Sequence, residues 1–144
     1  MMKDLLDFGL LLAALSLTIL CIASYWIPKA LSWREKLAGL TPLMRELFWT
    51  YSLYIWSSHI FFAILTFFFR DWLLGGTVEA AVVAGFMCLW WLARLGIQFF
   101  GFDLTEVEDS LANRMAKHAL TFLFFCLVLI FALTVWWNLG GMPR

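Results

Sequence analysis

The stretch ALTFLFFCLVLIFALTVWW, residues 119–137, contains no charged residue. The hydrocarbon core of a bilayer is about 30 Å thick, and a helix needs roughly 20 apolar residues to cross it. A strand of a membrane barrel is only about ten residues long and alternates apolar with polar positions, a pattern that this run lacks. The stretch therefore predicts a transmembrane helix.

The rest of the chain has the same apolar character. Of its 144 residues, 64% are hydrophobic and 14% are charged, and the mean hydropathy is +0.89. A soluble domain is about 45–50% apolar and about 25% charged. Ten basic and ten acidic residues give a formal net charge of zero, so no overall basic field would attract nucleic acid. The composition argues against a soluble enzyme, a disordered tail and a nucleic-acid binder.

Three further apolar runs can be outlined by helix-start and helix-stop signals. Pro28 closes the first run, and Thr41-Pro42 is a helix-start pair with Pro at the first helical position. Thr77 is the expected N-cap of the third helix, and Asn138 with the glycines that follow it ends the fourth. The chain is therefore expected to be an all-α, integral membrane four-helix bundle. It forms one transmembrane domain, residues 1–144, with spans at about 8–27, 43–69, 77–100 and 116–137.

Basic residues predict the orientation, because cytoplasmic loops carry an excess of Lys and Arg. The termini and the turn at residues 70–76 hold three: Lys3, Arg70 and Arg144. The two longer loops and the adjoining helix ends hold seven: Lys29, Arg34, Lys36, Arg45, Arg94, Arg114 and Lys117. We expect antiparallel up-down spans with both termini on the non-cytoplasmic side, in a multi-pass protein of the bacterial inner membrane.

Short interfacial helices are expected in both cytoplasmic loops. Residues 30–40 mix bulky apolar and basic side chains and could lie along the lipid headgroups. In the second loop, residues 105–108 form a capping box. The last helix is therefore expected to begin near Glu106 and to project beyond the bilayer.

The second span carries a polar stripe on and beside one helical face: Tyr51, Tyr54, Ser57, Ser58 and His59. We expect this stripe to face neighbouring spans or a partner subunit, with interhelical hydrogen bonds worth about 0.6–2 kcal/mol each. His59 also leaves open a tetrapyrrole-binding role, because imidazole is a common axial ligand. The other histidine, His118, lies about 15–20 Å away in depth, so an internal bis-histidine haem is not expected and no metal site is predicted.

A second polar group is expected at the cytoplasmic ends of the spans: Arg94, Arg45, Glu46, Gln98 and His118. An arginine inside a span either extends its head toward the interface or pairs with an acid, and Glu46 is the natural partner of Arg94. Two interpretations stay open. The group is a structural ion pair between the second and third spans, or it is a pocket for a lipid phosphate or an anionic cofactor.

Leu92-Ala93-Arg94 near the end of the third span, within a four-span chain of this length, loosely resembles the membrane-associated family of eicosanoid and glutathione metabolism. The resemblance implies glutathione binding by an Arg-Asn-Glu set in the second span. In this sequence the corresponding residues 45–59 contain no Asn and no acid after Glu46. The glutathione-site signature is therefore absent.

The sequence contains no HExxH, P-loop, GxSxG or CxxC motif, so no catalytic residue is assigned and an enzymatic role is not favoured. The leading hypothesis is an accessory or structural subunit of a larger membrane complex, acting through helix–helix and lipid contacts. Its expected partners are membrane lipids and other membrane subunits or a second copy. No cofactor is required by the sequence, and bound lipid is expected. The alternatives are a membrane enzyme or binder of an anionic lipid or thiol cofactor, and a tetrapyrrole-binding subunit using His59.

Overall fold

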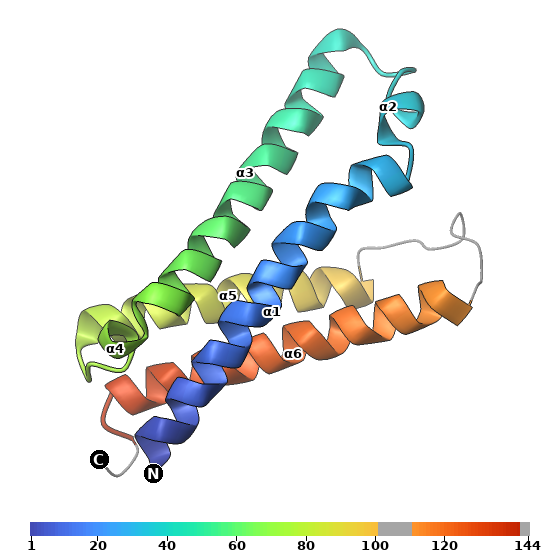
Figure 1. Ribbon diagram of the computed structural model, residues 1–144. Coiled ribbons are helices and arrows are strands. Elements are labelled where there is room, and N and C mark those ends of the chain that lie inside the picture. Colours follow the sequence, from blue (N-terminus) through green and yellow to red (C-terminus); the bar gives the residue numbers. More distant parts are fainter. Residues whose placement is uncertain (101–110, 142–144) are drawn as a thin grey trace.

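The computed structural model describes residues 1–100 and 111–141, and the ordered elements in these ranges are all helices (Figure 1). The helices are α1 (Met2–Ala30), α2 (Trp33–Lys36), α3 (Pro42–Phe68), α4 (Arg70–Leu73), α5 (Val78–Phe100) and α6 (Leu111–Asn138). Within the described ranges, α1, α3, α5 and α6 are long and apolar enough to cross a membrane. The predicted all-helical class is confirmed, as is the prediction of four helices long and apolar enough to span a membrane. The expected capping box at residues 105–108 and the helix start near Glu106 lie outside the described residues.

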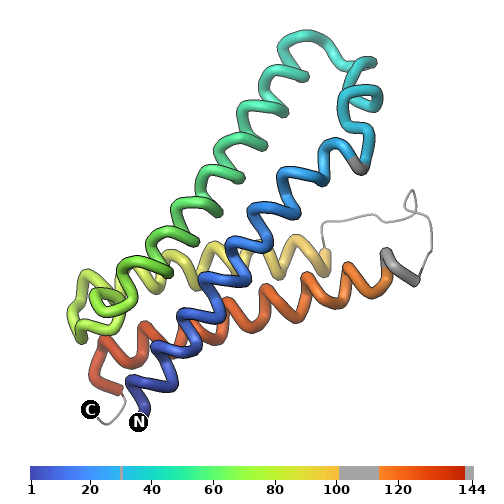
Figure 2. Tube along the Cα trace, in the orientation of Figure 1, coloured from blue at the N-terminus to red at the C-terminus, as the bar shows by residue number. Residues whose placement is uncertain are grey.

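The long helices form two hairpins, α1 with α3 and α5 with α6, which cross at an angle (Figures 1 and 2). Between the hairpins, α1 packs against α6. Helices α3 and α5 diverge from the end that holds α4, so the start of α3 and the end of α5 lie far apart (Figure 1). The molecule is therefore narrow at one end and open at the other.

Side chains of α6 hold the narrow end together. Asn138 donates from Nδ2 to the carbonyl oxygen of Leu73 at 2.7 Å, and its Oδ1 accepts from the Gly76 N–H at 2.8 Å. Trp137 donates from Nε1 to the Leu74 carbonyl oxygen at 3.0 Å. Arg70 of α4 pairs with Asp7 of α1 at 3.7 Å. The start of α1, the α4 turn and the end of α6 thus meet at the same end of the bundle.

Two predicted helix starts are confirmed by hydrogen bonds. Thr41 accepts a bond from the Met44 N–H at 3.4 Å, and Thr77 accepts one from the Ala80 N–H at 3.2 Å. Each cap satisfies a backbone donor that has no partner within the first helical turn. The predicted stop at Asn138 is also where α6 ends.

Helix α1 extends beyond the expected span at both ends, from Met2 to Ala30. At its start, Lys3, Asp4 and Asp7 lower the hydropathy, but they do not break a helix. At its end, Pro28 removes only one N–H donor in the last turn, and the Leu31 N–H still bonds the Ile27 carbonyl oxygen at 2.9 Å. Hydropathy predicts only the apolar stretch of a helix, and that stretch is shorter than the whole helix.

The loop after α1 contains a short helix, as expected, but only one turn of it. Ser32 adopts a left-handed backbone with φ of 49°, which separates α2 from α1. The Trp33 ring packs edge-on against Phe48 at 5.1 Å and lies 6.3 Å from Trp49. The turn is therefore folded back onto the start of α3, and its place at a membrane interface stays a prediction.

Candidate functional site

The structure divides the polar stripe of α3 between the interior and the surface. His59 is 2% exposed, whereas Tyr51 and Tyr54 are 62% and 68% exposed. Ser57 is exposed, and the half-buried Ser58 donates its hydroxyl to the Tyr54 carbonyl oxygen of its own helix at 2.8 Å. In the described part of the chain, none of these side chains forms a hydrogen bond to another helix. Contact between the stripe and a partner subunit stays a prediction.

His59 belongs to an aromatic stack that joins three helices. Its ring stacks on Trp91 of α5 at 5.2 Å with an interplanar angle of 27°. Trp91 in turn stacks on Phe124 of α6 at 5.5 Å and 28°, and Trp90 meets His59 edge-on at 6.5 Å. With Phe62, which packs against Trp90 at 5.5 Å, these rings join α3 to α5 where the two backbones separate. We call His59, Trp91 and Phe124 the aromatic stack.

Arg94 lies beside the aromatic stack and not beside the predicted acid. Its Cζ atom is 6.0 Å from the centroid of the Phe124 ring, at the outer limit of a cation–π contact. Arg94 and Glu46, both described, form no ion pair. Glu46 is exposed at the start of α3, which the divergence of the hairpins carries away from α5 (Figure 1).

The remaining members of the expected cytoplasmic pocket are spread over three helices. Arg45 is exposed on α3, Gln98 is half-buried on α5 and His118 is exposed on α6. No hydrogen bond or ion pair joins them to one another or to Arg94 in the part of the chain that the structure describes. Their sharing of one ligand stays a prediction.

Several buried nitrogen atoms around the aromatic stack have no hydrogen-bond partner: His59 Nδ1 and Nε2, Trp90 Nε1, Trp91 Nε1 and Arg94 Nε. The buried Thr66 hydroxyl, two turns further along α3, also has none. Each such group left unpaired costs about 1–3 kcal/mol. In the sequence, His59 and Arg94 fall in two separate predicted groups, and neither tryptophan belongs to a predicted site. The signal was present, because Trp90 and Trp91 precede Arg94 by four and three residues and so share its side of the helix.

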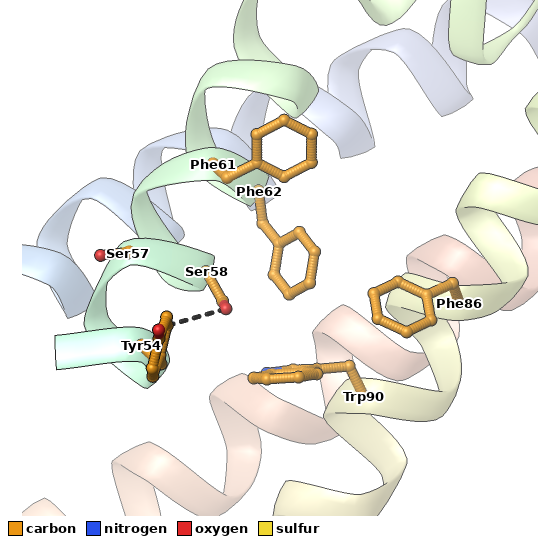
Figure 3. Close-up of a pocket in the computed structure, with 7 residues that line it drawn as sticks. All are labelled: Tyr54, Ser57, Ser58, Phe61, Phe62, Phe86 and Trp90. Carbon is orange, nitrogen blue, oxygen red and sulfur yellow. Dashed lines mark hydrogen bonds between the residues drawn. The ribbon is translucent and has the colours of Figure 1, made fainter. Parts of the chain in front are cut away.

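An open groove of about 300 Å³ adjoins this cluster between α3 and α5 (Figure 3). Its lining consists of Tyr54, Ser57, Ser58, Phe61, Phe62, Phe86 and Trp90. In Figure 3 the rings of Phe62, Phe86 and Trp90 project into the space between the two helices. The groove is therefore mainly aromatic, with two serine hydroxyls and a tyrosine at its α3 edge.

A second recess of about 260 Å³, between α1 and α3, is lined by Cys21, Ile22, Tyr25, Trp56 and Ile60. Trp56 donates from Nε1 to the Cys21 carbonyl oxygen at 3.1 Å there. The described residues contain no group of three or more His, Cys, Asp or Glu placed to hold a metal ion. Comparison with known protein families, curated proteins and solved structures finds no match to this chain.

Proposed function

We propose that this protein is an accessory or structural subunit of a larger membrane assembly, held in place by helix–helix and lipid contacts. The observation that carries the proposal is the pair of phenols on the outer face of α3. Tyr51 and Tyr54 are mostly exposed, and neither phenol hydroxyl forms a hydrogen bond within the described residues. The hydrocarbon core offers a hydroxyl no partner, whereas a neighbouring transmembrane helix does.

Helix α3 is the least covered of the four long helices. Only 17% of its most apolar stretch is buried, against 22% to 33% in the others. It packs against α1. Its exposed large side chains include Tyr51, Tyr54, Phe61 and Phe68, of which Tyr54 and Phe61 also line the groove toward α5. Lipid tails can cover the phenylalanines, but the phenols favour a protein partner that carries hydrogen-bonding side chains on a transmembrane helix.

The orientation belongs to the same proposal. The starts of α1 and α4 and the end of α6 share one end of the bundle. Most Lys and Arg residues of the chain belong to the loops and helix ends away from it. The excess of basic residues supports an orientation in which the two longer loops are cytoplasmic and both termini lie on the non-cytoplasmic side. A helical, multi-pass architecture is consistent with a bacterial inner membrane, since bacterial outer-membrane proteins are typically barrels.

The assembly can be tested by gentle extraction from native membranes and native mass spectrometry. We expect the protein to be released in a complex heavier than its own 16.7 kDa, with mass contributed by another chain. The double variant Tyr51→Phe/Tyr54→Phe removes only two hydroxyl groups and is expected to release the protein from that complex. Tyr25→Phe, which alters an exposed phenol on α1, is the matched control and should leave the complex intact.

Three results would contradict the proposal. A lone, lipid-free monomer from the native membrane would show that no assembly exists. A mass that is a whole-number multiple of one chain would indicate self-association in place of an accessory role. If the double tyrosine variant stays in the complex as fully as the control, the outer face of α3 is not the contact surface.

A further inference from the structure

We propose that the space between α3 and α5 binds a single anionic amphiphile, with its oxyanion on Arg94 and its alkyl chain in the groove lined by Phe62, Phe86 and Trp90. The shared chemistry is a phosphate or carboxylate attached to an apolar chain, as in a phospholipid or a free fatty acid. This site goes beyond the assembly proposal, because an isolated chain could bind such a ligand.

The buried N–H groups around the aromatic stack have no hydrogen-bond acceptor among the described residues. The buried nitrogens of Arg94, Trp90 and Trp91 each carry a hydrogen and cannot accept one. Both ring nitrogens of the nearly fully buried His59 are also without a partner. Water and acids satisfy such donors in soluble proteins, but Arg94 has no ion pair among the described residues. A ligand oxyanion would supply both the negative charge and the lone pairs.

The charged and aromatic residues of α5 are arranged along the helix as the head and the tail of an amphiphile are arranged across a bilayer leaflet. Phe86, Trp90 and Arg94 follow one another at four-residue spacing, so they lie on one side of the helix about 6 Å apart along its axis. Arg94 is six residues, or about 9 Å, from the end of α5 at Phe100, whereas Phe86 and Trp90 lie deeper. A head at Arg94 and a tail toward Phe86 would therefore follow the direction of the surrounding lipid.

The shape of the groove limits what the tail can be. Its volume of about 300 Å³ is at the lower limit of ligand sites, which span about 300–1,000 Å³. This size favours one alkyl chain over a macrocycle. The groove is open, and α3 and α5 diverge beside it (Figures 1 and 3). A lipid could enter sideways from the bilayer without unfolding either hairpin.

Native mass spectrometry of the full chain from nanodiscs tests this site. The nanodiscs contain dioleoyl phosphatidylcholine with one-tenth dioleoyl phosphatidylglycerol in one arm and one-tenth oleate in the other. We expect one phosphatidylglycerol or one oleate to stay bound in preference to phosphatidylcholine, and the added mass identifies which. Arg94→Gln should lower this retention about tenfold or more, since a hydrogen bond to a charged group is lost. Arg45→Gln removes an exposed arginine from α3, and we expect it to leave the retention of the anionic lipid unchanged.

A second variant tests the tail independently of the charge. Ser58→Phe places a ring in the groove and keeps Arg94, and we expect it to lower retention with an unchanged helical circular dichroism spectrum. Equal retention of phosphatidylcholine and the anionic lipids would overturn the proposal. An equal loss of bound anionic lipid in Arg45→Gln and Arg94→Gln would also overturn it, because that result indicates attraction to general surface charge. Full retention of the lipid in Ser58→Phe would overturn it as well. A visible absorbance band in the purified protein would assign the cluster to a pigment at His59 instead.

Discussion

Asn138 and Trp137 bond backbone atoms that lie 62 to 65 residues earlier in the chain. Asn138 is almost fully buried and uses both ends of its amide, donating to two carbonyl oxygens and accepting from one N–H. An asparagine at the end of a helix is an ordinary stop signal in a sequence. Here the same side chain also fixes the turn between the two hairpins.

Asn138→Ala should destabilise the protein by about 1–3 kcal/mol, because it leaves the Leu73 carbonyl and the Gly76 N–H without their partner in a partly or fully buried place. The measurement is thermal unfolding in detergent followed by circular dichroism. Thr121→Ala is the control on the same helix, since its exposed hydroxyl bonds only the Lys117 carbonyl one turn back. Equal melting temperatures for the two variants would show that the Asn138 bonds contribute nothing to stability.

Among the elements, the turn from α4 to α5 shows how a short segment positions two long ones. Gly76 has a φ of 73°, a backbone conformation that costs a residue with a side chain about 1–2 kcal/mol. Its N–H points to Asn138 in this conformation. Thr77 then caps α5 directly after it. The start of α5 is therefore defined by one glycine with a positive φ and two hydrogen bonds.

Gly76→Ala is expected to lower stability by about 1 kcal/mol or more, because alanine disfavours a positive φ. Gly39→Ala provides the matched comparison: Gly39 also lies in a turn, its φ is not positive, and an added Cβ would meet open space. It should be neutral or slightly stabilising. Chemical unfolding of both variants in the same detergent measures the difference, and a destabilisation of the same size in both would contradict the role given to the backbone of Gly76.

In the whole molecule, one buried core joins the two hairpins, with Leu10 and Leu17 of α1 in the same cluster as Leu127 of α6. Small residues let α1 and α6 approach, as where Gly9 faces Ile130. Further along, the aromatic stack joins α3, α5 and α6 through Trp91, which is fully buried. Away from the end that holds α4, α3 and α5 diverge (Figure 1).

Trp91→Ala should cost about 3–5 kcal/mol, as expected for removing a fully buried aromatic side chain, and should loosen one hairpin from the other. Limited proteolysis and thermal unfolding in detergent both report the change. Trp26→Ala removes an exposed tryptophan of α1 and is expected to change stability far less. A Trp91→Ala protein as stable as the Trp26→Ala protein would show that the stack does not join the hairpins.

Much of the fold could be predicted from hydropathy and capping signals, and much less of the candidate site. The stretch at residues 119–137 and the caps at Thr41 and Thr77 depend on neighbours within one or two turns. They therefore appear in the structure as predicted. The ion pair between Arg94 and Glu46 was inferred from similar depth in the membrane. Depth does not specify the angle at which two hairpins cross, and the divergence of α3 from α5 leaves that pair unformed.

The amino-acid order alone specifies an all-helical membrane protein with four apolar helices, because a run of apolar residues meets the solvation needs of its backbone only as a helix in hydrocarbon. It also specifies where several helices begin and end, through local hydrogen bonds. The packing of the hairpins brings His59 and Arg94 to the same stack of rings, and it leaves Tyr51 and Tyr54 exposed. Those outcomes depend on the rotation and crossing of helices through contacts between residues far apart in the chain, which no local pattern encodes.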